Sequence, residues 1–226
     1  MYIYLSIDLI IIAVPLLLTF IRKFRFYRYF LPLLACTTLV GALFVYWDMV
    51  FAAKGYWHFN KHFIIGIKYL GLPIEELLFF LVVPYSCLFI YEAIRKNIKE
   101  HKVLINPYYY SSLVPIFLYF ACSYNAHIYT YTVFIMAAVF LMAALIIDRS
   151  IFSSLFYWSY ITIGTLLFFT INYILTSLPV VIYRPSAILG NRFFTIPFED
   201  FLYNFILLSS YYIIYIAAKK ILKRLD

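Results

Sequence analysis

Seven long apolar stretches dominate the chain and leave only short polar segments between them. They span residues 2–20, 29–51, 73–91, 108–122, 128–147, 151–175 and 197–218. A transmembrane helix needs about 20 largely apolar residues, because the hydrocarbon core of a bilayer is roughly 30 Å thick and an α-helix rises about 1.5 Å per residue. We therefore predict a transmembrane helix in each stretch.

Composition supports this prediction. Of the 226 residues, 66% are hydrophobic and 12% are charged, whereas a soluble domain is roughly 45–50% apolar and about 25% charged. The net charge of +8 is not evidence for a nucleic-acid partner, because the basic residues gather at the ends of the apolar stretches and not on one face of a soluble domain. We expect an all-α integral membrane protein, with residues 1–226 in a single membrane domain.

The distribution of Lys and Arg predicts the orientation, since basic residues beside transmembrane helices stay preferentially in the cytoplasm. With seven crossings, thirteen of the eighteen basic residues fall on one side. That side should be cytoplasmic, which places the C-terminus in the cytoplasm and the N-terminus outside the cell membrane. The longer non-helical segments, 52–72 and 176–196, would then both lie on the outer face.

Two parts of the chain match each other without a gap at an offset of 124 residues. The matched pairs are Asp48 with Asn172, Gly66 with Gly190, Lys68 with Arg192, Pro73 with Pro197, Glu75 with Glu199, and Glu76 with Asp200. This pattern predicts two parallel three-helix repeats, 1–100 and 125–226, joined by a connector helix at about 107–123. Equivalent residues of parallel repeats face a shared interior, so the two acid pairs should converge there.

Acidic residues within apolar stretches are functional candidates, because a carboxylate at membrane depth costs at least about 2.5–3.5 kcal/mol. A proline in the first helical turn would place each acid pair near the outer end of its helix. Neighbouring helical residues diverge by about 100°, so one acid of each pair can face a cavity while the other turns toward Lys68 or Arg192. The alternative is that the acids sit at a wet interface and balance these two cations. Asp8, outside the matched set, is interpreted as a polar contact between helices.

A neutral carboxyl facing an apolar cavity can protonate an alkene, and a second, ionised carboxylate can take a proton back. Aromatic residues make up 23% of the chain, and ring faces stabilise cations. We expect the aromatic residues beside the acid pairs to line a cavity that can stabilise a carbocation: Tyr69, Phe79, Phe80, Phe193, Phe194 and Tyr203. Most aromatic residues would instead face lipid or form interface belts. No metal and no cofactor are expected, because His58 and His62 lack an HExxH pattern and a third ligand, and no phosphate-binding glycine loop is present.

The residues around both acid pairs resemble those of a known family, the small membrane carotenoid cyclases of the heterodimeric lycopene cyclase type. The first half carries Gly71-Leu72-Pro73-Ile74-Glu75-Glu76-Leu77-Leu78-Phe79-Phe80, with Trp47-Asp48 and Trp57-His58-Phe59 before it. The second half carries Asn172-Tyr173-Ile174-Leu175-Thr176, Gly190-Asn191-Arg192 and Thr195-Ile196-Pro197-Phe198-Glu199-Asp200-Phe201. The chain is similar to a single-chain version with both halves fused.

This resemblance implies an intramolecular lyase or isomerase that converts lycopene to β-carotene without net redox change. An acid protonates the terminal double bond of the ψ-end, the neighbouring alkene attacks the cation, and loss of a ring proton gives a β-ionone ring. The implied catalytic residues are Glu75, Glu76, Glu199 and Asp200, with Asp48 and Asn172 as orienting or relay partners. The implied substrate-binding residues are Phe79, Phe80, Tyr203, Trp47, Trp57, Lys68 and Arg192. The resemblance does not say which carboxyl is the acid and which is the base. Contacts with other carotenoid-pathway enzymes also stay open.

Two other functions remain open at this point. Relatives of the same fold hydrate acyclic carotenoid ends, where water captures the cation. A small proton-coupled transporter would use the acid pairs as proton carriers. A retinal photoreceptor is disfavoured, because range 197–218 contains no lysine.

Overall fold

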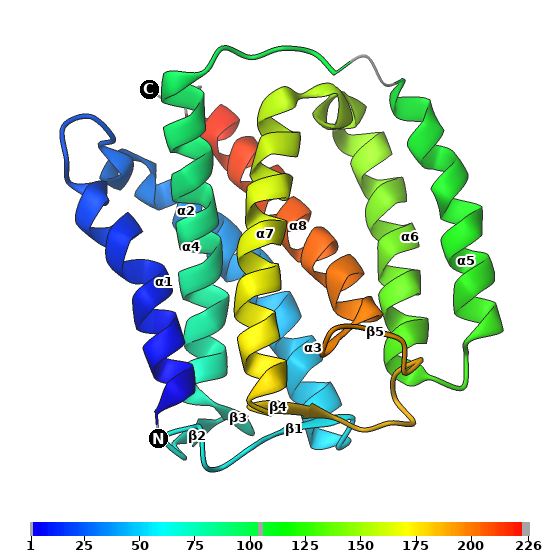
Figure 1. The fold of residues 1–226 in the computed structure, drawn as a ribbon. Helices are drawn as coiled ribbons and strands as arrows, with labels where there is room; N and C mark the ends of the chain where they lie inside the picture. The colour runs from blue at the N-terminus through cyan, green and yellow to red at the C-terminus, as the bar shows by residue number, and fades with distance from the viewer. Residues whose placement is uncertain (1, 104–105, 223–226) are drawn as a thin grey trace.

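The chain folds into a bundle of helices capped at one end by short strands (Figure 1). The computed structural model describes residues 2–103 and 106–222. Within these residues the α-helices are α1 (Ile3–Thr19), α2 (Phe30–Cys36), α3 (Ala42–Ala53), α4 (Ile74–Asn97), α5 (Leu113–Ser123), α6 (Ile128–Asp148), α7 (Leu155–Ser177) and α8 (Phe198–Leu222). The π-helical turn η2 (Thr37–Gly41) joins α2 to α3, so the described helices form seven segments, one in each predicted range.

Five of these segments are long and apolar enough to cross a membrane: residues 26–53, 128–153, and helices α4, α7 and α8. Helix α1 is apolar but has 17 residues. Helix α5 has 11 residues and follows the 3₁₀-helix η3 (Pro107–Ser112), at the place predicted for the connector. The chain is therefore a helical membrane protein. That α1 and α5 also cross the membrane remains a prediction.

Helices α4 and α8 each begin with an acid pair and end with a basic pair. Glu75 and Glu76 lie in the first turn of α4, and Arg95 and Lys96 lie in its last turn. This order complements the helix dipole, which favours negative charge at the N-terminus and positive charge at the C-terminus. Pro73 is the N-cap residue of α4, so the helix begins one residue later than expected and the proline precedes its first turn.

The two long segments between helices form three small antiparallel sheets at the N-terminal end of the bundle (Figure 1). Strands β2 (Lys68–Tyr69) and β3 (Leu72–Pro73) form a tight hairpin before α4, and β5 (Arg192–Phe193) and β6 (Ile196–Pro197) form another before α8. Gly71 sits in the first hairpin turn with φ +83°, a conformation that favours glycine. Strand β1 (Trp57–Phe59) pairs with β4 (Val181–Tyr183) and ties the two segments together.

The elements of the first half recur at a nearly constant distance along the chain. Strand β1 begins at residue 57 and β4 at residue 181, a difference of 124, and the same difference separates the starts of α4 at 74 and α8 at 198. In the β1–β4 pair, His58 lies opposite Ile182, its counterpart at this offset. The two middle residues of equivalent strands therefore face each other.

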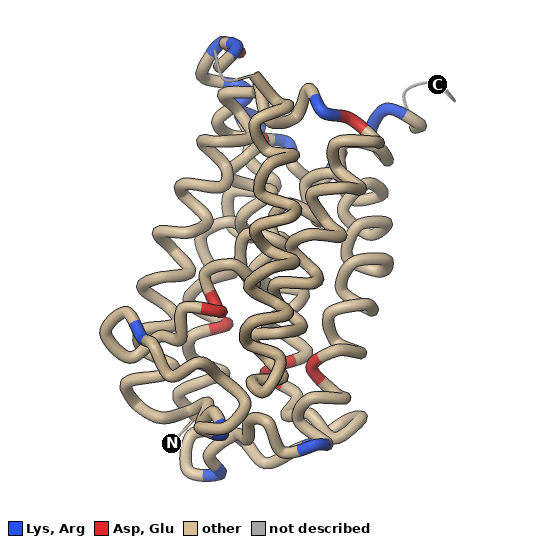
Figure 2. The backbone as a smooth tube through the Cα atoms, turned by 90° about the vertical axis from the view of Figure 1, so that its right-hand side faces the viewer, with Lys and Arg blue, Asp and Glu red and all other residues tan. Residues whose placement is uncertain are grey.

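The bundle brings helices from both halves together. Helix α1 packs against α4, α8 packs against α2 and α6, and α7 packs against both α4 and α8. Helix α5 packs against α6 at the edge of the bundle (Figure 1). Along the backbone, acidic residues gather in the half of the bundle that carries the N-terminus, and others lie at the opposite end (Figure 2).

Candidate functional site

A cavity of about 80 Å³ lies just inside the strand-capped end, where helices of both halves meet. Its carboxyl and amide side chains come from four different helices: Asp48 from α3, Glu76 from α4, Asn172 from α7 and Asp200 from α8. We call this space the acid cavity. The structure thus brings together four of the six residues that the sequence proposed as the acid–base set and its orienting or relay partners.

Asp200 is the most completely hydrogen-bonded of these carboxyls. It is 3% exposed and accepts from the hydroxyls of Tyr129 and Tyr183 and from the Asn172 amide nitrogen, each at 2.8 Å. Burial, together with the negative charge of Asp200, holds the pKa of the Tyr183 phenol well above its ordinary value of 10.0. Tyr183 therefore stays protonated and donates. Three donors match the acceptor-only character of an ionised carboxylate.

Glu76 and Asp48 form the other side of the acid cavity. The Tyr4 hydroxyl donates to Glu76 Oε2 at 2.6 Å. Asp48 is buried, and its Oδ2 atom has no hydrogen-bond partner. Neither carboxyl forms an ion pair in the part of the chain that the structure describes. Two buried carboxyls that line one cavity without a cation are unfavourable as two negative charges.

Glu75 and Glu199 do not line the acid cavity. Each is buried and accepts a backbone N–H from the segment ahead of its helix: Ile65 donates to Glu75 Oε1 at 2.6 Å, and Leu189 donates to Glu199 Oε1 at 2.7 Å. The Thr130 hydroxyl also donates to Glu199, at 2.5 Å. Because successive residues diverge around a helix, one acid of each pair holds the outer segment while Glu76 and Asp200 face the cavity.

Of the aromatic residues predicted to bind substrate, some line the acid cavity and one does not. Phe79, Phe80, Tyr203 and Trp57 line the acid cavity. Trp47 lies behind this wall, with its ring centroid 5.6 Å from that of Tyr203.

The expectation that Tyr69, Phe193 and Phe194 line the same cavity is wrong. Tyr69 is 62% exposed and Phe194 is 70% exposed. Phe193 and Phe194 instead pack on the Phe169 ring of α7, at 5.6 and 6.1 Å between centroids. Phe193 is also 49% exposed, and neither ring lines the acid cavity.

The expected partnership of the acid pairs with Lys68 and Arg192 is also absent from the structure. Both cations are exposed, and the ion pairs of the described residues involve Glu92 and Asp148 instead. Arg192 donates to the Thr195 carbonyl at 2.6 Å, and its guanidinium lies 6.0 Å from the Tyr183 ring centroid. It therefore reaches the site only through Tyr183, whose hydroxyl contacts Asp200.

Asp8 does not form the polar contact between helices that the sequence suggested. It is buried on α1, yet neither carboxyl oxygen has a hydrogen-bond partner.

Sequence reasoning missed the three tyrosines that donate to the cavity carboxyls, Tyr4, Tyr129 and Tyr183. With 24 tyrosines in the chain, residue type carries little information. Only Tyr183 could have been proposed from its position, because it lies in the segment that matches Trp57-His58-Phe59 at the offset of 124 residues.

The fold and the site together define a class: a helical membrane protein that buries carboxyl groups beside an aromatic cavity, an arrangement suited to proton transfer to an apolar molecule. The model of a protein family described as lycopene cyclase matches residues 1–94 and 126–217. The chain therefore belongs to the lycopene cyclase family and is an enzyme of carotenoid cyclisation. The two matched segments agree with a chain that contains both fused halves. Comparisons with curated proteins and with solved structures gave no match.

Proposed function

We propose that this protein cyclises the ψ-ends of lycopene to β-ionone rings by proton transfer within the acid cavity. The observation that carries this proposal is the joint placement of Asp48, Glu76 and Asp200 in a cavity walled by Phe79 and Phe80. Buried carboxyls supply and remove protons, and ring faces stabilise a carbocation without capturing it as a nucleophile would.

The different surroundings of the three carboxyls support different roles. The Asp48–Glu76 pair has an unpartnered oxygen and no cation beside it, so it holds the proton that is transferred to the terminal alkene carbon. The internal alkene then forms the new carbon–carbon bond. Asp200, held by three donors, balances the positive charge of the cation. A ring carbon returns one proton to the Asp48–Glu76 pair, so the net reaction is an isomerisation and the enzyme is an intramolecular lyase.

The arrangement of the chain supports two parallel repeats related by an axis along the membrane normal. In an antiparallel strand pair, a twofold axis passes between residues that face each other, and His58 faces Ile182, its counterpart 124 residues later. The repeats would span 1–100 and 125–226, with η3 and α5 as the connector. Under this arrangement Asp48 and Glu76 come from one repeat, and Asn172 and Asp200 from the other.

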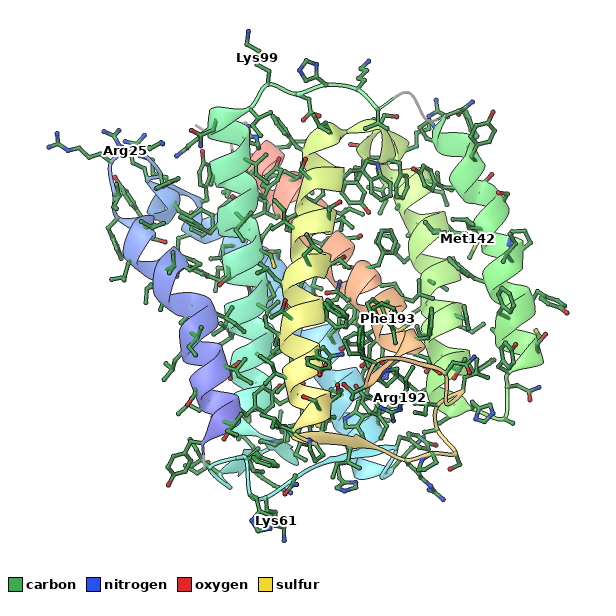
Figure 3. All side chains as sticks on the ribbon, in the orientation of Figure 1. Arg25, Lys61, Lys99, Met142, Arg192 and Phe193 are labelled. Carbon is green, nitrogen blue, oxygen red and sulfur yellow. The ribbon has the colours of Figure 1, made fainter. Side chains whose placement is uncertain are left out.

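The basic residues support a cytoplasmic C-terminus and an outer N-terminus. Arg25 and Lys99 lie at the end of the bundle opposite Lys61 (Figure 3). With the larger basic group in the cytoplasm, the acid cavity lies near the outer surface of the membrane.

The direct test is the pigment profile of lycopene-accumulating cells that express the wild type or one of three variants, Asp48→Asn, Glu76→Gln and Asp200→Asn. Wild type should produce ring-closed carotenoids. Each variant should lower conversion by about 10²-fold or more, because an amide of similar shape cannot transfer the proton or balance the cation.

Two results would overturn the proposal. A hydroxylated acyclic product would show that water, not ring closure, captures the cation. Unchanged cyclisation in all three variants would remove the acid cavity from the reaction and favour proton-coupled transport.

A further inference from the structure

A second, smaller cavity adjoins the acid cavity on the side of the bundle centre. It measures about 50 Å³ and lies between α4 and α7, with residues of α1 and α8 completing its wall. The two cavities share five lining residues: Phe79, Phe168, Asn172, Leu175 and Tyr203. We call this second space the apolar chamber.

The apolar chamber is elongated along the helices. On α7, its lining residues Asn172, Phe168 and Gly164 follow one another at four-residue intervals. Eight residues of α-helix rise about 12 Å. The chamber therefore runs from the acid cavity at one end toward the middle of the bundle at the other.

The polar side chains in its wall are already hydrogen-bonded to the protein. Ser86 donates to the Ile11 carbonyl at 3.1 Å, and Asn172 donates to Asp200 at 2.8 Å. Asn204 donates to the Thr165 hydroxyl at 3.3 Å. An occupant therefore meets mainly hydrocarbon surface, which disfavours a polar ligand because its own polar groups would be left unpaired.

The chamber also borders the lipid-facing side of α7. Leu167, one of its lining residues, is 40% exposed. An apolar molecule can therefore approach from the bilayer without crossing water.

We propose that the apolar chamber binds the polyene chain of the acyclic carotenoid while the end group lies in the acid cavity. The identity of this occupant rests on the proposed function. Continuity with the acid cavity favours the polyene over a lipid acyl chain, because a molecule in the chamber must end beside Asp200 and Glu76.

The test fills the chamber and measures bound carotenoid. Ile171→Trp places a large ring in its wall from α7, and Val83→Phe does so independently from α4. Leu166→Trp is the matched control, because Leu166 is on the same helix but is 63% exposed. All three changes are made in a Glu76→Gln background, expressed in lycopene-accumulating cells and purified in detergent, and carotenoid per protein is read by absorbance.

Both filling variants should retain about tenfold less carotenoid than the control, at an unchanged melting temperature. Equal carotenoid content in the filling and control variants would overturn the proposal, as would displacement of a co-purified phospholipid without loss of carotenoid. If Asp48→Asn, Glu76→Gln and Asp200→Asn all cyclise lycopene as the wild type does, the proposed function fails, yet total carotenoid bound to the Glu76→Gln protein still reports on the chamber. Different results therefore reject the proposed function and the proposed role of the chamber.

Discussion

At the scale of single residues, the two acids of each pair have different surroundings. Glu76 and Asp200 face the acid cavity, whereas Glu75 and Glu199 hold backbone N–H groups of the outer segments. The sequence placed all four in one acid–base set, because adjacent residues cannot be told apart without knowing what lies on each side of the helix. We infer that Glu75 and Glu199 are positioning residues.

This difference predicts opposite results for two neighbouring substitutions. Glu75→Gln keeps an oxygen that can accept from the Ile65 N–H, so lycopene conversion should stay within about twofold of wild type. Glu75→Ala should lower stability by about 0.5–1.5 kcal/mol, because this hydrogen bond is lost. Conversion in cells and thermal unfolding in detergent measure the two effects. A loss with Glu75→Gln as large as that with Glu76→Gln would place Glu75 in the proton transfer itself.

Tyr183 carries a second prediction at this scale. Tyr183→Phe removes one of the three donors to Asp200 and should lower conversion about tenfold, since a hydrogen bond to a charged group contributes about 1.5–3 kcal/mol. The raised pKa keeps the wild-type phenol protonated below 10.0, so the ratio of wild-type to variant activity should be equal at about pH 6 and about pH 9. A ratio that falls at the higher pH would show that Tyr183 ionises.

At the scale of elements, α4 and α8 are joined far from the acid cavity by a buried charged cluster. Glu92 of α4 accepts from the Tyr215 hydroxyl at 2.8 Å and pairs with Lys219 of α8. Arg95 approaches the same carboxyl at 3.1 Å. Since α4 and α8 also supply Glu76 and Asp200 to the acid cavity, the cluster fixes the relative position of the two helices.

Breaking this cluster should destabilise the protein strongly. Glu92→Gln removes the buried carboxylate charge that pairs with Lys219 and Arg95 and should lower stability by about 3–5 kcal/mol. Lys220→Ala is the control, because Lys220 forms an exposed pair with Asp148 at 3.3 Å, and such pairs contribute about 0–1 kcal/mol. Thermal unfolding of the purified variants in detergent compares them, and equal melting temperatures would contradict a stabilising role for Glu92.

At the scale of the whole molecule, the two halves share one site. Three helices of each half line the acid cavity, and the β1–β4 pair, which joins the halves, contributes to its wall. The equivalent positions 48 and 172 are Asp and Asn, and Asn172 donates to Asp200 while Asp48 keeps an unpartnered oxygen. The halves therefore supply different chemistry to a common cavity.

The proposed orientation predicts which end of the bundle faces outward. A membrane-impermeant thiol reagent should label Lys61→Cys in intact cells, but should label Lys99→Cys only after permeabilisation. The native Cys36, Cys87 and Cys122 are replaced by Ala in both variants, so that each protein has a single thiol. Labelling of Lys99→Cys in intact cells would reverse the orientation.

The sequence by itself determined the helices, because apolar runs of membrane-spanning length have few alternatives to an α-helix in lipid, where backbone polar groups must be paired within the segment. It also proposed six polar residues for the site, of which Asp48, Glu76, Asn172 and Asp200 line the acid cavity. Only the tertiary structure decided that Glu75 and Glu199 face the outer segments, that Phe193 and Phe194 pack outside, and that tyrosine hydroxyls replace Lys68 and Arg192 as partners of the acids. These outcomes depend on how helices rotate and pack against one another, and neither residue type nor spacing along the chain encodes that rotation.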